Sequence, residues 1–263
     1  MPSFMDFLGS FFSKTPVPAK APAVPPVGPT PAPVALPAAH APKPDPMVFQ
    51  WPAKQGVGIT VDHLVRMGAS PANAAKYCKA FNDVCERFGI NTRARICAFI
   101  AQTFHESSCL RVVRENLNYT AKNCMDFWPK SFPTDASTVG YTMNPQALAN
   151  KMYGGKNGNT QPGDGWRYSG RGVIQITFRG NYEPCGVALG LDLVNHPELL
   201  ELPEHAVASA GWFWTDNKLN AVADGDNEAA VIRATEIING RHNGLDNRMA
   251  LWRKAKVVFA SFK

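Results

Sequence analysis

The protein has 263 residues, 45% hydrophobic and 18% charged, so the chain is long and apolar enough to bury a substantial core. Its 27 basic and 21 acidic residues give a net charge of +6. This charge is compatible with binding to an anionic polymer, a membrane surface or a bacterial envelope, and it does not distinguish among these partners. The six cysteines form no C-x-x-C pair, which argues against a zinc site and predicts buried reduced thiols.

Residues 1–14 read MPSFMDFLGSFFSK and place Phe4, Leu8, Phe11 and Phe12 on one helical stripe. The stripe is too short to span a bilayer, and the segment lacks the basic region and the cleavage site of a signal peptide. It is therefore either a frayed terminus or an amphipathic element that docks on a membrane, a particle or a partner.

Residues 15–52 form a Pro/Ala-rich linker, because twelve of the 22 prolines lie within residues 15–46. Proline removes backbone donors, so we expect a disordered but stiff, polyproline-like spacer. A proline-motif ligand for a recognition domain is the alternative. Regular patterning starts after this tract, which predicts one folded domain over residues 53–263.

Helical periodicity dominates that domain. Residues 71–88 show it first and stop at Gly89. Thr92 can cap a second helix, whose apolar residues recur at three-and-four spacing down to Glu106. Later helices bring the total to about six and are predicted at 145–154, 203–214, 227–238 and 247–259.

Residues 155–182 are rich in glycine and polar side chains, with one β-like run at 172–177. Alternation along a strand would direct Gln175 and Thr177 to one side and Ile174 and Ile176 to the core. The whole pattern predicts a mainly α fold with a small strand or loop lobe, and a cleft where the two meet.

Two glutamates, Glu106 and Glu115, lie nine positions apart across Ser107-Ser108. In one continuous helix their carboxylates would sit on opposite faces and about 13 Å apart along the axis. The serines and the β-branched pair Val112-Val113 instead indicate that the helix ends at Glu106 and the chain turns back. The second glutamate can then face the first across a groove.

Two carboxyls across a groove suit glycosidic cleavage, in which one donates a proton to the leaving oxygen and the other activates water or attacks. Glu106, at an apolar helix end, is the candidate for the acid with a pKa raised by desolvation. Glu115, between polar neighbours, is expected to be more solvated and to be the base. The alternative is that Glu106 merely ends a helix and Glu115 pairs with Arg114 or Arg111 on the surface.

Three stretches resemble glycoside hydrolase family 19: FIAQTFHESSCLRVVRENLNYT at 99–120, YGGKNGNTQPGDGWRYSGRGVIQITFRGNY at 153–182 and IINGRHNGLDNRMALWRKA at 237–255. They occur in the family's order, and the resemblance runs from near position 55 to the C-terminus. It is closest to the phage endolysin branch, whose members cut peptidoglycan, rather than to the plant chitinase branch. The resemblance implies an α+β lysozyme-like fold.

The resemblance also implies roles for particular residues. Glu106 corresponds to the general acid and Glu115 to the base. Thr177 matches a hydroxyl that helps to hold the nucleophilic water, and Gln175 an amide that contacts a sugar. Asn239 matches an asparagine that binds substrate near the base.

Aromatic residues flank the same motifs, and aromatic faces commonly pack against sugar rings. Tyr119, Tyr182 and Trp166 are therefore secondary substrate-binding candidates, with a place in the core as the alternative for each. The chain departs from the family at Phe178, where members often have a glycine. An arginine that joins the base in plant members corresponds here to Arg248 or Arg253.

These patterns predict an inverting glycosidase that cuts the β-1,4 bonds of peptidoglycan as a monomer, with no cofactor, metal or nucleic-acid partner. With no evident signal peptide, such an enzyme would be made in the host bacterial cytoplasm and act on the cell wall in the periplasm. A chitinase and a non-catalytic wall-binding protein are the alternatives.

Overall fold

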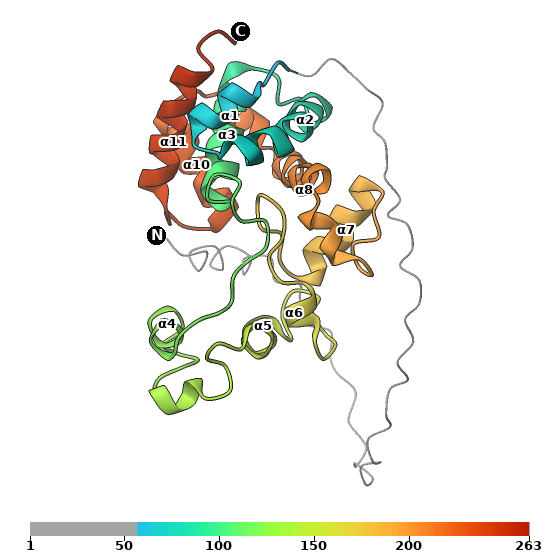
Figure 1. Cartoon of the computed structure of the whole chain (residues 1–263), viewed down its shortest axis with the longest axis vertical. Coiled ribbons are helices and arrows are strands. Elements are labelled where there is room, and N and C mark those ends of the chain that lie inside the picture. Colours follow the sequence, from blue (N-terminus) through green and yellow to red (C-terminus); the bar gives the residue numbers. More distant parts are fainter. Residues whose placement is uncertain (1–56, 263) are drawn as a thin grey trace.

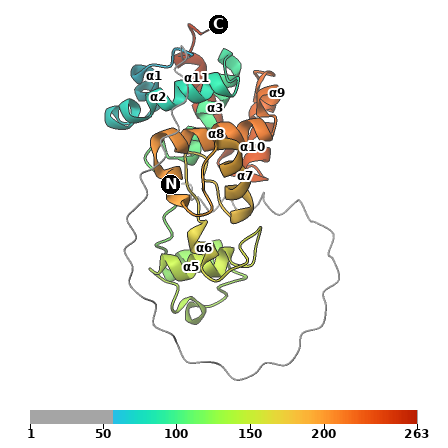
Figure 2. The ribbon, with the colours of Figure 1, turned by 90° about the vertical axis from the view of Figure 1, so that its right-hand side faces the viewer.

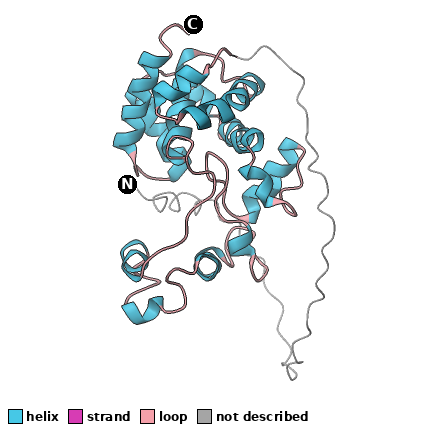
Figure 3. Cartoon of the chain, viewed as in Figure 1, coloured by secondary structure: helices cyan, strands magenta, loops and turns pink. Residues whose placement is uncertain are grey.

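The computed structural model describes residues 57–262, and that part of the chain is built from helices joined by loops, without a strand (Figure 3). The expected docking segment 1–14, the linker 15–52 and the domain boundary at 53 lie outside the described residues. The helices are α1 (Val61–Met67), α2 (Pro71–Arg87), α3 (Arg93–Glu106), α4 (Ala121–Phe127), α5 (Pro145–Tyr153), α6 (Asp164–Arg167), α7 (Arg179–Leu189), α8 (Pro203–Asp216), α9 (Leu219–Ala223), α10 (Glu228–Asn239) and α11 (Leu245–Val258), with short 3-10 turns η2 (Asp135–Thr138) and η3 (Pro197–Glu201).

Local capping explains why several helices begin where the sequence predicted. The Thr92 hydroxyl accepts a hydrogen bond from the backbone N–H of Arg95 and starts α3, which ends at Glu106 as expected. Asn144 caps α5 in the same way, with proline in the first turn. The prediction of a mainly helical domain is confirmed.

The larger lobe surrounds α3. In Figure 1, α1, α2, α8, α10 and α11 gather around this helix, and α3 packs chiefly against α11 while α2 packs against α8. Every residue from Ile96 to Phe104 is buried, including the polar Gln102 and Thr103. Because α3 is enclosed on all sides, its C-terminal residue Glu106 is held on a rigid support.

A smaller lobe contains α4, η2, α5 and α6, which lie away from the larger helical group in both views (Figures 1 and 2). It has its own apolar core, with Phe132, Leu148 and Tyr153 fully buried in it. The chain passes from the larger lobe to the smaller one between α3 and α4, and Glu115 lies on this connection.

The run 172–177 is not the predicted strand. The structure has a tight turn there, flanked by isolated bridges of Arg171 with Arg114 and with Ile176. Gly172 has a φ of 81°, and a Cβ at this position would lie 2.6 Å from Ser209 Oγ. Gln175 also has a positive φ, of 59°, so the chain reverses and the expected alternation of faces is lost.

The six cysteines are free thiols, as expected, and four of them are fully buried: Cys85, Cys97, Cys124 and Cys185. None of the helices within residues 57–262 combines the length and the apolar character needed to cross a bilayer.

Candidate active site

Glu106 forms an ion pair across the larger lobe. Its carboxylate accepts a hydrogen bond from Arg248 of α11, and the side chains are only 5% and 2% exposed. Arg248 also donates to the side-chain oxygen of Gln102, which lies one turn earlier on α3. The end of α3 is thus fixed by a buried charge from the C-terminal helix.

Neither of the two candidate C-terminal arginines pairs with Glu115, the expected base, within the described residues. Arg253 is exposed and pairs with Glu228, whereas Arg248 lies beside Glu106, the expected acid. Asn239 belongs to the same group, because its amide and Arg248 Nε both donate to the carbonyl of Asn243, at 2.8 and 3.3 Å. Its bonds therefore connect Asn239 to Arg248 and so to the acid, and its expected role in binding substrate near Glu115 stays a prediction.

Glu115 is buried in a different setting, with 6% exposure. One carboxylate oxygen accepts the backbone N–H of Gly170 at 2.5 Å, and the other accepts the hydroxyl of Tyr153 at 2.8 Å. Desolvation raises the pKa of Glu115 to about 7, although the bonds from Gly170 and Tyr153 and the charge of Arg171 act in the opposite direction. This carboxyl can exchange a proton near neutral pH.

The expectation that Glu115 would be the more solvated carboxyl is wrong, because Glu115 is buried as a whole residue whereas Glu106 is only half-buried. Pairing of this segment with residues 170–172 turns the side chain toward Tyr153 and away from solvent. The alternative of a surface pair with Arg114 is wrong as well. The Arg114 guanidinium stacks over Trp166, 4.7 Å from the ring centre, and lies 3.6 Å from Glu201.

Gln175 and Thr177 are both fully buried. The Gln175 amide nitrogen donates to the carbonyl of Gly172 at 2.8 Å, while its side-chain oxygen has no partner among the described residues. The Thr177 hydroxyl donates to the carbonyl of Gln175 at 3.1 Å. In the described conformation these side chains brace the turn and do not form the expected polar floor.

Of the three aromatic candidates, one lies in the core and two are partly exposed. Tyr182 is fully buried, and its hydroxyl donates to the carbonyl of Ser169 at 2.6 Å and accepts from Arg171 at 3.1 Å, so it is part of the core and not a sugar platform. Tyr119 is half-buried and packs edge-on against Trp128 at 5.6 Å. Trp166 is half-buried and lines a cavity.

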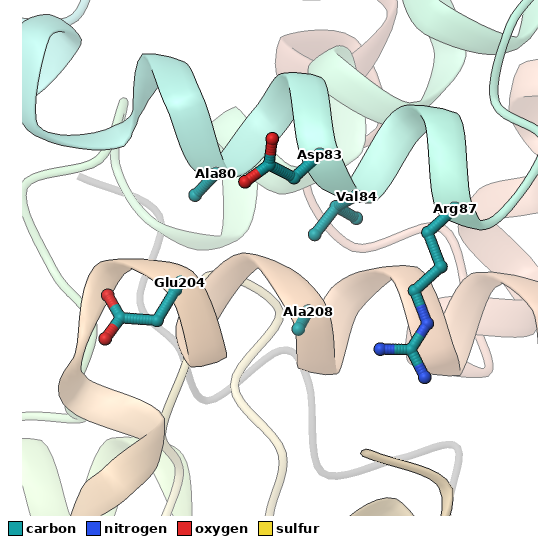
Figure 4. Close-up of a pocket in the computed structure, with 6 residues that line it drawn as sticks. All are labelled: Ala80, Asp83, Val84, Arg87, Glu204 and Ala208. Atoms are coloured by element: carbon teal, nitrogen blue, oxygen red, sulfur yellow. The ribbon is translucent and has the colours of Figure 1, made fainter. Parts of the chain in front are cut away.

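That cavity measures about 670 Å³ and lies where α6, the start of α7 and η3 meet. A second cavity, between α2 and α8, measures only about 20 Å³, and Figure 4 shows the small side chains of Ala80, Val84 and Ala208 between the two helices. Such a volume is about that of one water molecule and cannot admit a sugar. Neither cavity is lined by Glu106 or Glu115.

Several residues that build the site carried no signal in the sequence. Tyr153 and Gly170 lie 38 and 55 positions from Glu115, so only the folded chain reveals them as its partners. Gln102 lies on a mostly apolar stretch of α3, and nothing in that stretch marks it as a partner of Arg248.

Known proteins resemble the chain in sequence and in fold. Residues 71–232 match the family model described as chitinase class I. The chain is 33% identical over 182 residues to a "Glycosyl hydrolase family 19 domain-containing protein" of Haemophilus influenzae, covering 68% of this chain and 88% of that protein. It is also 33% identical over 123 residues to Endochitinase 4 of Solanum tuberosum, covering 46% of this chain but 35% of the plant protein.

The fold is shared with a solved structure, that of chitinase C from Streptomyces griseus HUT6037. The TM-score is 0.51, and the match covers 80% of this chain and 96% of the other at 21% sequence identity. A likeness at this level of identity speaks for the fold and not for the substrate.

Proposed function

The chain belongs to glycoside hydrolase family 19, and from this premise we propose that it cuts the β-1,4 bonds of bacterial peptidoglycan in the manner of the phage endolysin branch. One observation carries the proposal. The sequence places Glu106 and Glu115 on either side of a chain turn, and each is a buried carboxyl fixed by partners distant in sequence. Enclosed carboxyls of this kind are what hydrolysis of a glycosidic bond requires.

In the mechanism we propose, Glu106 protonates the leaving oxygen and Glu115 removes a proton from the attacking water. A base with a pKa of about 7 binds a proton more strongly than an ordinary carboxylate, which favours proton removal from water. The bonds from Gly170 and Tyr153 keep that carboxylate in one orientation. Arg248 pairs with Glu106 in the free protein, so the acid role requires this pair to weaken when a glycan arrives.

Inversion of the anomeric centre needs room for a water molecule between the carboxyls. We therefore expect them to be about 6.5–9.5 Å apart in the substrate complex, whereas a separation of about 5 Å would indicate a retaining enzyme. Thr177 is proposed to hold this water and Gln175 to contact a sugar. Both roles require the turn at 172–177 to shift, because the two side chains are enclosed in the free protein.

Peptidoglycan is the proposed substrate because the resemblance of the three motifs is closest to the peptidoglycan-cutting branch and because the net charge of +6 suits an anionic wall. We further propose that the enzyme is a monomer that acts on the wall in the periplasm, with residues 1–14 available for membrane or particle docking. Chitin is the second candidate, favoured by the plant endochitinases among the relatives.

The test is to digest purified peptidoglycan and chitin oligomers with the wild type and with Glu106→Gln, and to identify the new reducing ends by mass spectrometry. Muramic-acid or glucosamine ends released from peptidoglycan by the wild type, and at least about a hundredfold less by the variant, would support the proposal. Cleavage of chitin with intact peptidoglycan would replace it with the chitinase. Full activity of Glu106→Gln would remove Glu106 from the mechanism.

A further inference from the structure

The cavity of about 670 Å³ has the size of a ligand pocket, and neither proposed catalytic glutamate lines it. Its wall combines arginines with aromatic rings. The residues that matter here are Trp166, Arg167, Tyr168, Arg171, Arg179 and Asn195.

The three arginines are compensated to different extents. Arg171 pairs with the carboxylate of Glu201 at 2.8 Å. Within residues 57–262 the Arg167 guanidinium donates only to the carbonyls of Val194 and Asn195, at 3.2 and 3.0 Å, and a neutral carbonyl does not cancel its positive charge. The Arg179 guanidinium makes no hydrogen bond or ion pair with any other residue of the described chain, and its backbone N–H donates to the side-chain oxygen of Asn159.

Two carboxylates also line the cavity, and each has a partner of its own. Asp164 accepts the backbone N–H of Gln161 at 2.9 Å, and Glu198 lies 3.3 Å from the His196 ring. Neither forms an ion pair with Arg179 within the described residues. The cavity wall thus carries three arginines against two carboxylates, an excess of one positive charge, and Arg179 is the arginine that an anionic ligand can pair with.

The cavity is connected to the surroundings of Glu115. Arg171 follows Gly170, whose N–H binds the Glu115 carboxylate, and Trp166 lies under Arg114, the residue before Glu115. A group attached to a glycan near Glu115 could reach this wall. The ligand is thus best sought among the substituents of the polymer that the enzyme cuts.

We propose that this cavity binds the stem peptide of peptidoglycan through its carboxylates, with Arg179 as the anion-binding residue. The inference rests on the proposed function and names what distinguishes the substrate from chitin. Chitin carries neutral acetamido groups, whereas the stem peptide carries the free carboxylates of D-glutamate and D-alanine. A guanidinium matches a carboxylate with two parallel hydrogen bonds, which gives both affinity and orientation.

Binding is tested with the full-length protein and a soluble, sugar-free stem tetrapeptide, L-Ala-γ-D-Glu-L-Lys-D-Ala, by titration calorimetry. We expect Arg179→Gln to weaken binding at least about tenfold and Arg179→Lys to weaken it less. The charge-matched control Arg233→Gln, on the exposed face of α10, should bind like the wild type. A peptide with both carboxylates amidated should not bind. Equal affinity of the wild type and Arg179→Gln, or no binding by the wild type, would overturn the proposal.

Cleavage gives an independent measurement. The substrates are intact peptidoglycan and the same strands treated with an amidase, which keep the lactyl carboxylate on the sugar and lose the peptide. We expect Arg179→Gln to lower the ratio of kcat/KM for intact over stripped strands about tenfold, and Arg233→Gln to leave the ratio unchanged. An unchanged ratio in Arg179→Gln would count against the site. Its folding is verified by comparing its melting temperature with that of the wild type.

The two proposals fail in different ways. If the wild type binds the tetrapeptide through Arg179 but cuts neither form of peptidoglycan, the proposed binding site stands and the proposed activity fails. If the wild type cuts both forms but neither binding nor cleavage depends on Arg179, the proposed activity stands and the proposed binding site fails.

Discussion

At Glu115 a buried carboxyl with a pKa of about 7 makes the proposed role testable by pH. A base must be deprotonated, so kcat/KM should have a rising limb at about pH 7, and it should fall at higher pH where Glu106, the acid, loses its proton. Tyr153→Phe removes a hydrogen bond that lowers this pKa, so the rising limb should move to higher pH. Initial rates on a soluble glycan from about pH 5 to about pH 9 measure both. A rate that instead falls through about pH 7 would mean that Glu115 is the acid and that the two glutamates exchange roles.

The same carboxyl should limit the stability of the protein at alkaline pH. Its pKa is about 7 when folded and close to the ordinary 4.5 when unfolded, so the folded state binds the proton more tightly. This contribution is complete below about pH 4.5 and is lost as the pH rises through about 7, a difference of roughly 3 kcal/mol. Glu115→Gln cannot ionise and should be more stable than the wild type at about pH 8, but not at about pH 4. Denaturant unfolding at the two pH values measures this, and a parallel loss of stability in the variant would contradict it.

Among the elements, the turn at 172–177 depends most on a single residue. Gly172→Ala adds a Cβ 2.6 Å from Ser209 Oγ in a backbone with a φ of 81°. Gly190→Ala is the matched control, because its φ is 72° and no atom lies within 4 Å of the added Cβ. The control should cost about 1 kcal/mol from the backbone alone, and Gly172→Ala about 1–3 kcal/mol more. Chemical denaturation gives both values. Equal losses would show that the contact with Ser209 relaxes freely.

Elements whose boundaries depend on local signals could be predicted from the sequence, and the others could not. Helix α3 begins at Thr92 and ends at Glu106 as expected, because its cap and its apolar spacing are local signals. The run 172–177 was wrongly predicted to be a strand because its residues are apolar and β-branched enough to be typical of a buried strand. The positive φ of Gln175, which reverses the chain, cannot be predicted from a glutamine. Helix α7 was missed because Pro184 lies within it.

The candidate site could be predicted only as far as its local sequence signals reach. The glutamates themselves could be identified from their spacing and their resemblance to the family, but the environment of Glu115 could not. That environment comes from Tyr153 and Gly170, which reach it from segments that no local pattern connects. Phe178 has a φ of 73°, a conformation that glycine adopts more readily than other residues, and aromatic packing against Tyr153 holds the larger side chain in place.

At the scale of the whole molecule, the proposed catalytic residues depend on two cores of unequal size. Glu106 ends a helix of the larger core, which has 45 buried apolar residues, whereas Tyr153 fixes Glu115 from a core with eight. Stability grows with the apolar surface that is buried, so the smaller lobe should open at a lower free energy than the larger one. Opening would release Glu115 from Tyr153 while Glu106 keeps its pairing with Arg248.

Native-state hydrogen exchange measures this difference directly. Amides of α4 and α5 should exchange through openings of lower free energy than those of α3, which are enclosed within the larger core. Phe132→Ala creates a cavity in the smaller core and should lower the opening free energy of α4 and α5 by about 3–5 kcal/mol. It should also lower the free energy of the global opening through which α3 exchanges, and it should reduce turnover, because Glu115 loses its fixed partner more often. Phe81→Ala, in the larger core, is the control and should lower the protection of α3 but not that of α4 and α5, whose openings leave the larger core folded. Equal protection of α3 and α5 in the wild type would show instead that the two lobes open as one unit.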